Sequence, residues 1–69
     1  MNVEYYPGTQ LKVEFIDGQV MIGEVFTFES SDNTDTGLDE LIFVPESGKL
    51  KGRHVVFNES EVKNIEVLD

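Results

Sequence analysis

The sequence contains no cysteine and only one histidine, His54, and this scarcity excludes two kinds of stabilising site. Without cysteine there is no disulfide, and one imidazole without thiolates cannot complete the tetrahedral ligand set of a structural zinc site. Apolar runs are only a few residues long, so the sequence predicts neither a membrane-spanning helix nor the apolar core of a signal peptide. We therefore expect a cytoplasmic protein with no membrane partner.

Positive charge is scarce as well, because 5 Lys and Arg stand against 14 Asp and Glu and give a formal net charge of −9. Non-specific binding of nucleic acid depends on neutralising phosphates with Lys and Arg, so the average field of this chain opposes it. The same field repels anionic membranes. The simplest interpretation is that acidity keeps a small β protein with exposed strand edges in solution.

Catalytic groups are equally few. His54 lies in an apolar strand segment with no nucleophile beside it in the sequence, so a surface or partly buried strand histidine is the simpler interpretation. No serine lies in a nucleophile elbow or in a glycine-rich phosphate loop. We therefore predict no catalytic residue, no cofactor and a protein that is not an enzyme.

The strongest structural signal that is present is a β-hairpin between Leu11 and Glu29. Apolar residues from Leu11 to Phe15 alternate with charged ones, which is the period of a strand with one buried face. Asp17-Gly18 separates two apolar runs, and such a pair predicts a two-residue turn. The expected strands are therefore 10–16 and 19–29.

A two-residue turn fixes which residues of this hairpin face one another. The pairs would be Phe15 with Val20, Val13 with Ile22, and Leu11 with Glu24. The last pair would bury a carboxylate, so the direction or register of the second strand must change nearby. Glycine inside a strand often marks a bulge or a bend, and we expect Gly23 to be the corner at which one long strand enters two sheets.

The rest of the chain predicts three more strands and little helix. The expected segments are an N-terminal lead at 1–6 with a tyrosine over one end of the core, a solvent loop at Ser30–Asp39, strands at Leu41–Val44, Lys51–Asn58 and 63–68, and a single 3₁₀ turn at 58–61. In the fourth strand either Val55 and Phe57 or Val56 faces inward. Five strands in 69 residues predict a single all-β domain, residues 1–69, folded as a small and strongly bent barrel.

The acidic loop invites comparison with a calcium site, since oxygen-rich loops with a glycine bind hard cations. Its acids and those beside it are Glu29, Asp32, Asp35, Asp39 and Glu40. Counted from Asp32, the third and fifth ligand positions hold threonines and the twelfth holds Phe43 where a bidentate glutamate is required. We predict no metal site.

The hairpin, the corner glycine and the 3₁₀ turn together resemble the Sm-like and Src-homology-type small barrels. The first Sm motif is similar to Gly18, Gly23, Val25 and Phe28-Glu29, with Asp32-Asn33 falling where the family carries Met-Asn. The second motif, a basic residue and a glycine before an aliphatic strand, is similar to Lys51-Gly52 followed by Arg53-His54-Val55. The chain differs from the family pattern by an acidic, expanded loop after Asn33 and by an extended C-terminus.

The Sm resemblance implies a ring-forming protein that binds single-stranded RNA at a central pore. Carried over to this chain, the RNA contacts would fall on Asn33, Lys51 and Arg53. The net charge and the absence of catalytic groups favour a different hypothesis: a non-enzymatic interaction module that binds a protein partner and self-associates through barrel edge strands. The RNA-binding ring remains the alternative.

Overall fold

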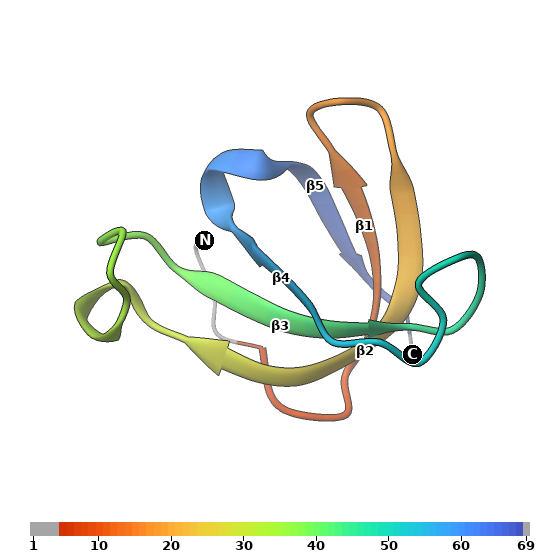
Figure 1. Cartoon of the computed structure of the whole chain (residues 1–69), viewed down its shortest axis with the longest axis horizontal. Helices are drawn as coiled ribbons and strands as arrows, with labels where there is room; N and C mark the ends of the chain where they lie inside the picture. Colours follow the sequence, from red (N-terminus) through yellow and green to blue (C-terminus); the bar gives the residue numbers. More distant parts are fainter. Residues whose placement is uncertain (1–4, 69) are drawn as a thin grey trace.

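The structure is a computed structural model that describes residues 5–68. In this range the chain folds into one antiparallel five-stranded sheet (Figure 1). The strands are β1 (Gln10–Phe15), β2 (Val20–Glu29), β3 (Glu40–Pro45), β4 (Val55–Asn58) and β5 (Val62–Val67). Two short 3₁₀ helices, η1 (Ser31–Asn33) and η2 (Glu59–Glu61), are the helical segments of this range. The prediction of an all-β fold with five strands is confirmed.

The sheet order is β4-β3-β2-β1-β5, so strands β4 and β5 lie at opposite edges although only η2 separates them in the chain. In a flat sheet these edges would lie about 19 Å apart, at roughly 4.8 Å per strand. A three-residue 3₁₀ segment rises only about 6 Å. The sheet must therefore curl until the end of β4 lies near the start of β5.

Hydrogen bonds hold η2 across the open side of the curled sheet. The Glu59 N–H donates to the Asp39 carbonyl (2.9 Å) just before β3, and the Ile16 N–H donates to the Glu61 carbonyl (3.0 Å) just after β1. In residues 5–68 no ladder joins β4 to β5, so the sheet remains open with two edges. What is observed is a curled sheet, and strand pairing within the described residues does not close it into the expected barrel.

The hydrophobic core lies inside this curl and follows the alternation in the sequence. On β1 and β3 every second residue is buried, as the period of two predicts. The buried apolar side chains are Leu11, Val13, Phe15, Val25, Leu41, Phe43 and Phe57. The Phe57 ring packs edge-on against both Phe15 and Phe43, with ring centroids 5.0 and 6.0 Å away. These contacts join β4 to the hairpin through the interior.

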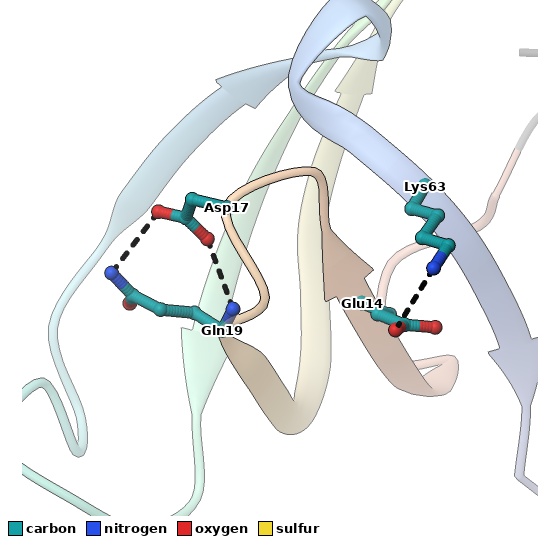
Figure 2. A network of polar contacts seen from close by, with 4 residues as sticks. All are labelled: Glu14, Asp17, Gln19 and Lys63. Atoms are coloured by element: carbon teal, nitrogen blue, oxygen red, sulfur yellow. Dashed lines mark hydrogen bonds and ion pairs between the residues drawn. The ribbon is translucent and has the colours of Figure 1, made fainter.

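The turn between β1 and β2 is longer than predicted. The Phe15 N–H donates to the Gln19 carbonyl (2.8 Å), and the Gly18 N–H donates to the Phe15 carbonyl (3.0 Å). The loop therefore has three residues and ends at Gly18, whose φ of 92° is the left-handed conformation that this loop requires. Asp17 accepts hydrogen bonds from the Gln19 N–H (2.9 Å) and Nε2 (3.2 Å), as Figure 2 shows.

The extra loop residue shifts the hairpin register by one, and the predicted pairing was wrong. The observed pairs include Val13 with Met21, Leu11 with Gly23, and Gln10 with Glu24. Glu24 is exposed in this register, so the buried carboxylate of the predicted register does not arise. The longer turn alone keeps the Glu24 carboxylate out of the core, so no change of strand direction at Gly23 is needed for that purpose.

Gly23 lies where β2 passes from the β1 ladder to the β3 ladder, as expected of the corner, but it is not a bulge. The irregularity in β2 lies at Phe26, where the β2–β3 register shifts between Val25 and Thr27. Gly23 itself pairs with Leu11 of β1 and with Pro45 of β3, so it belongs to both ladders. The long strand β2 does take part in two pairings, but the bulge follows the glycine by three residues.

The second half of the chain differs from the prediction mainly at β4. This strand begins at Val55, four residues later than expected, because residues 51–53 form a turn in which Gly52 has a φ of 77°. Phe57 is buried and Val56 is 59% exposed, which decides the inward face in favour of Val55 and Phe57. The expected third strand, the 3₁₀ turn and the last strand are confirmed to within one or two residues.

The N-terminal lead is described only from Tyr5 onward. Tyr5 is half-buried and packs against the core, as expected of a ring that covers one end of it, whereas Tyr6 is exposed. The Thr9 N–H donates to the Tyr6 carbonyl (3.1 Å), and Gly8 has a φ of 88°, so Pro7-Gly8 forms the turn that its sequence predicts. Residues 1–4, the start of that lead, lie outside the described range, as does residue 69.

Candidate interaction surfaces

Most of the positive charge of the chain lies in the connection between β3 and β4, residues 46–54, which we call the basic loop. It holds Lys49, Lys51 and Arg53, three of the five cations of the sequence, with Glu46 as its only acid. Every residue of the basic loop is exposed. Within residues 5–68 none of these three cations forms an ion pair, whereas Lys63 lies 3.8 Å from Glu14 (Figure 2). The basic loop therefore presents uncompensated positive charge on an acidic protein.

Backbone hydrogen bonds give the basic loop a defined shape. The Gly52 N–H donates to the Pro45 carbonyl (3.0 Å), the Arg53 N–H to Leu50 (3.0 Å) and the Lys51 N–H to Gly48 (3.3 Å). Gly48 and Gly52 both have left-handed φ values, 82° and 77°, which residues with a Cβ rarely adopt. The cations are thus carried on an ordered double turn.

A groove of about 480 Å³ lies between the start of β2 and the basic loop. Its volume falls in the range of about 300–1,000 Å³ that is typical of ligand sites. Four of the eight lining residues are apolar and Lys49 contributes a charge; the full lining is Gln19, Val20, Met21, Pro45, Ser47, Gly48, Lys49 and Leu50. Val20 is 51% exposed and Leu50 is 37% exposed, so this apolar surface is not used by the core.

A second apolar patch lies on the outer face of β2, β3 and β4. The ring of Phe26, which is exposed at the bulge, stacks on the ring of His54 with centroids 4.4 Å apart and planes tilted by 34°. Val56 is exposed on β4, opposite Ile42 of β3. The only imidazole is thus held against an aromatic ring, and among the residues described no nucleophile hydrogen-bonds to it.

The acidic loop, residues 29–40, satisfies many of its polar groups internally. The Ser31 N–H donates to Asp39 Oδ1 (2.9 Å), and the Thr34 hydroxyl donates to the Leu38 carbonyl (2.8 Å). A hydrogen bond from the Ser30 hydroxyl, helped by the Asp32 backbone N–H, holds the pKa of the exposed Asp32 carboxyl below its ordinary value. Within residues 5–68 no group of three acids or histidines is arranged to hold a metal ion.

The residues that the Sm resemblance assigned to RNA do not lie together in one subunit. Asn33 ends η1 in the acidic loop, where its side chain donates to the Ser30 hydroxyl (3.4 Å). Lys51 and Arg53 lie in the basic loop. The acidic loop precedes β3 and the basic loop follows it, and Figure 1 shows the two loops at opposite ends of the long axis.

The sequence pointed to Lys51 and Arg53 at this end of the molecule, but it indicated neither Lys49 as a site residue nor the groove beside it. Its lining comes from two segments about 25 residues apart, 19–21 and 45–50. The one local indication of the groove was Leu50, an apolar residue that lies between two lysines just after a turn glycine. No strand alternation around Leu50 predicts that its side chain is buried in the core.

Comparisons with known proteins give no relative: no family model, no curated protein and no solved structure matches the chain. None of the helices in residues 5–68 has the length and apolar character needed to cross a bilayer.

Proposed function

We propose that the chain is a non-enzymatic interaction module that self-associates and binds a protein partner through the edges of its sheet. The observation that carries the proposal is the pair of edge strands, β4 and β5, each of which pairs on one side only within residues 5–68. An edge strand presents unpaired backbone groups that another chain can extend into a ladder. Val56 on β4 and Val67 on β5 expose apolar surface at these edges.

The architecture proposed with this function is a small barrel of the Sm-like or Src-homology type. Three features support this architecture: the sheet order, the curl of the sheet and the hydrogen bonds that hold η2 to the ends of β1 and β3. Together they bring the edge strands β4 and β5 near each other at one end of the sheet. Such a barrel leaves short edges, which favour pairing with a limited number of partners over open aggregation. The high acidity acts in the same direction through like-charge repulsion.

The test is the molar mass in solution, measured by sedimentation equilibrium between about 10 µM and 1 mM, a span chosen to bracket weak association. The chain mass is 7.8 kDa, and we expect a concentration-dependent or stable multiple of it. Val56→Lys should reduce that mass, because lysine at an edge opposes strand pairing. Ile16→Lys is the matched control, since Ile16 is 68% exposed in the β1–β2 turn and lies on no edge. A wild-type protein that stays at one chain mass throughout would refute self-association.

Binding of single-stranded RNA by a ring is the second candidate, and one arrangement favours it. Lys51 and Arg53 are free of ion pairs in the described range, and His54 follows them directly and stacks on the exposed Phe26. Cations beside an exposed aromatic ring are the usual elements of a single-strand site. A ring would gather several copies of this arrangement, so that the local field could exceed the effect of the net charge.

Titration of fluorescent oligo-U and oligo-A RNA at low and moderate salt separates the two candidates. If the net charge of −9 dominates, binding should be no tighter than about millimolar at physiological salt. The RNA candidate requires micromolar binding that weakens with salt and is lost when Lys51 and Arg53 are both replaced by alanine. Replacement of Lys12 and Lys63 removes the same charge elsewhere and should leave such binding nearly unchanged.

A further inference from the structure

The groove beside the basic loop combines two features that the fold itself does not use. Its apolar lining is half exposed at Val20 and Leu50, although neither residue is needed to fill the core. Burying apolar surface of this kind contributes roughly 25 cal/mol per Å². The groove therefore offers free energy to a ligand that brings an apolar side chain.

The charge around the groove selects the kind of ligand. Lys49 belongs to the lining, and Lys51 and Arg53 follow on the same ordered turns. Within residues 5–68 none of the three cations forms an ion pair, so a carboxylate beside the groove would meet Lys49 directly and would also be attracted by the two cations that follow it in the loop. A basic ligand would be repelled here and drawn instead to the acidic loop.

We infer that this groove binds an acidic peptide segment that carries an apolar anchor residue. The anchor packs between Leu50 and the first residues of β2, and the flanking carboxylates lie against Lys49 and its neighbours. Nucleic acid fits the lining poorly, because no aromatic ring lines the groove for base stacking. Backbone hydrogen bonds already hold the basic loop in shape, so the protein loses little conformational entropy when the peptide binds.

This inference rests on the proposal that the chain is an interaction module, but it does not depend on self-association. The edges β4 and β5 and the groove use different residues, since Val56 and Val67 do not line the groove. Substitutions can therefore test each surface separately. If peptide binding fails while the molar mass still exceeds one chain, only the present inference is lost.

The experiment is an NMR titration of the ¹⁵N-labelled full chain with synthetic octapeptides. The probe is Ser-Gly-Asp-Leu-Leu-Asp-Gly-Ser, and we expect shift changes confined to residues 19–21 and 45–54 with a dissociation constant of about 100 µM. Two control peptides replace both leucines by serine or both aspartates by lysine, and each should bind at least about tenfold more weakly. Raising the salt from 50 to 300 mM should weaken the probe severalfold.

Matched variants of the protein assign the binding to the groove. Leu50→Ser should weaken the probe about fivefold or more, whereas Val56→Ser, which also replaces an exposed apolar side chain but on β4, should leave it unaffected. Lys49→Ser should weaken it about threefold, while Lys12→Ser removes the same charge from the outer face of β1 without effect. Spectra of each variant with wild-type dispersion show that the fold is retained.

Three results would overturn the inference. The first is no shift change with the probe at 2 mM, and the second is equal binding of the serine peptide, which would leave only charge attraction. The third is a fall in molar mass in Leu50→Ser without any peptide binding. That result would identify the occupant of the groove as a second copy of the chain.

Discussion

The carbonyl oxygen of Val44 lies 2.1 Å from the point where a Cβ atom on Gly23 would stand. The Cα atom of Pro45 lies 2.7 Å from the same point. Both atoms belong to the backbone of β3, so no change of rotamer can make room for a side chain. The missing side chain is what lets β2 approach β3 this closely where it leaves the β1 ladder.

Replacing Gly23 by alanine should therefore destabilise the protein strongly. The methyl group would push two paired strands apart, at a cost of about 3 kcal/mol or more. In a domain of this size that corresponds to a fall in melting temperature of more than about 12 °C, measured by circular dichroism.

The control for Gly23→Ala is Gly8→Ala. Apart from Gly8 itself and its two chain neighbours, no atom of the described residues lies within 4 Å of a Cβ atom placed on Gly8, whose φ is 88°, so alanine there meets only backbone strain of about 1 kcal/mol. Equal losses in the two variants would show that crowding against β3 is not the reason for glycine at position 23.

The sequence predicted the strands well because their signal is local. The alternation of apolar and polar residues predicts the bounds of β1 and β3 to within one residue, and the composition of residues 58–61 predicts the observed 3₁₀ turn. The hairpin register was missed because Asp17-Gly18 suits both a two-residue and a three-residue loop. Only the Phe15–Gln19 hydrogen bond distinguishes the two loops.

The candidate site was predictable only in part. The cations of the basic loop stand out in so acidic a sequence, but the groove depends on how close the β1–β2 turn comes to residues 45–50. The placement of Asn33 away from Lys51 likewise follows from the strand boundaries. Because β4 begins at Val55 and not at the predicted Lys51, the basic loop is a long connection between β3 and β4. Similarity to a short motif does not predict where a strand begins.

Gly18→Ala should destabilise the β1–β2 turn without changing the fold. The φ of 92° at this residue is a left-handed conformation that costs a residue with a Cβ about 1–2 kcal/mol. Gly18→Asn should lose clearly less, since asparagine tolerates this region better. Urea denaturation measures both changes, and equal losses would contradict the three-residue loop.

Asn58→Ala should lower stability by about 1 kcal/mol through the start of η2. The Asn58 side-chain oxygen accepts from the Ser60 N–H (2.9 Å), and the Asn58 N–H donates to Glu61 Oε2 (2.9 Å). Asn64→Ala, on exposed β5, is the matched control and should change the free energy of unfolding by less than about 0.5 kcal/mol. If the two variants are alike, the cap does not hold the link between β4 and β5.

Tyr5 should ionise at a higher pH than an ordinary tyrosine. Partial burial against the core raises the pKa of its phenol above 10.0. Absorbance at 295 nm in Tyr6→Phe, where Tyr5 is the only tyrosine left, reports this titration alone. Because the neutral phenol is favoured in the folded state, its contribution to stability is complete below about pH 10 and is lost as the pH rises through the folded pKa. A midpoint below 10 would contradict the burial of Tyr5.

The acidic and basic loops lie before and after β3, at opposite ends of the longest extent of the molecule, 31 Å, so their opposite charges are widely separated. At physiological ionic strength charges are screened over about 8 Å, which is much less than this length. A charged partner near one end therefore experiences the sign of that end and not the net charge of −9. We therefore expect the basic loop to be turned toward an acidic segment of the kind proposed above before contact is made.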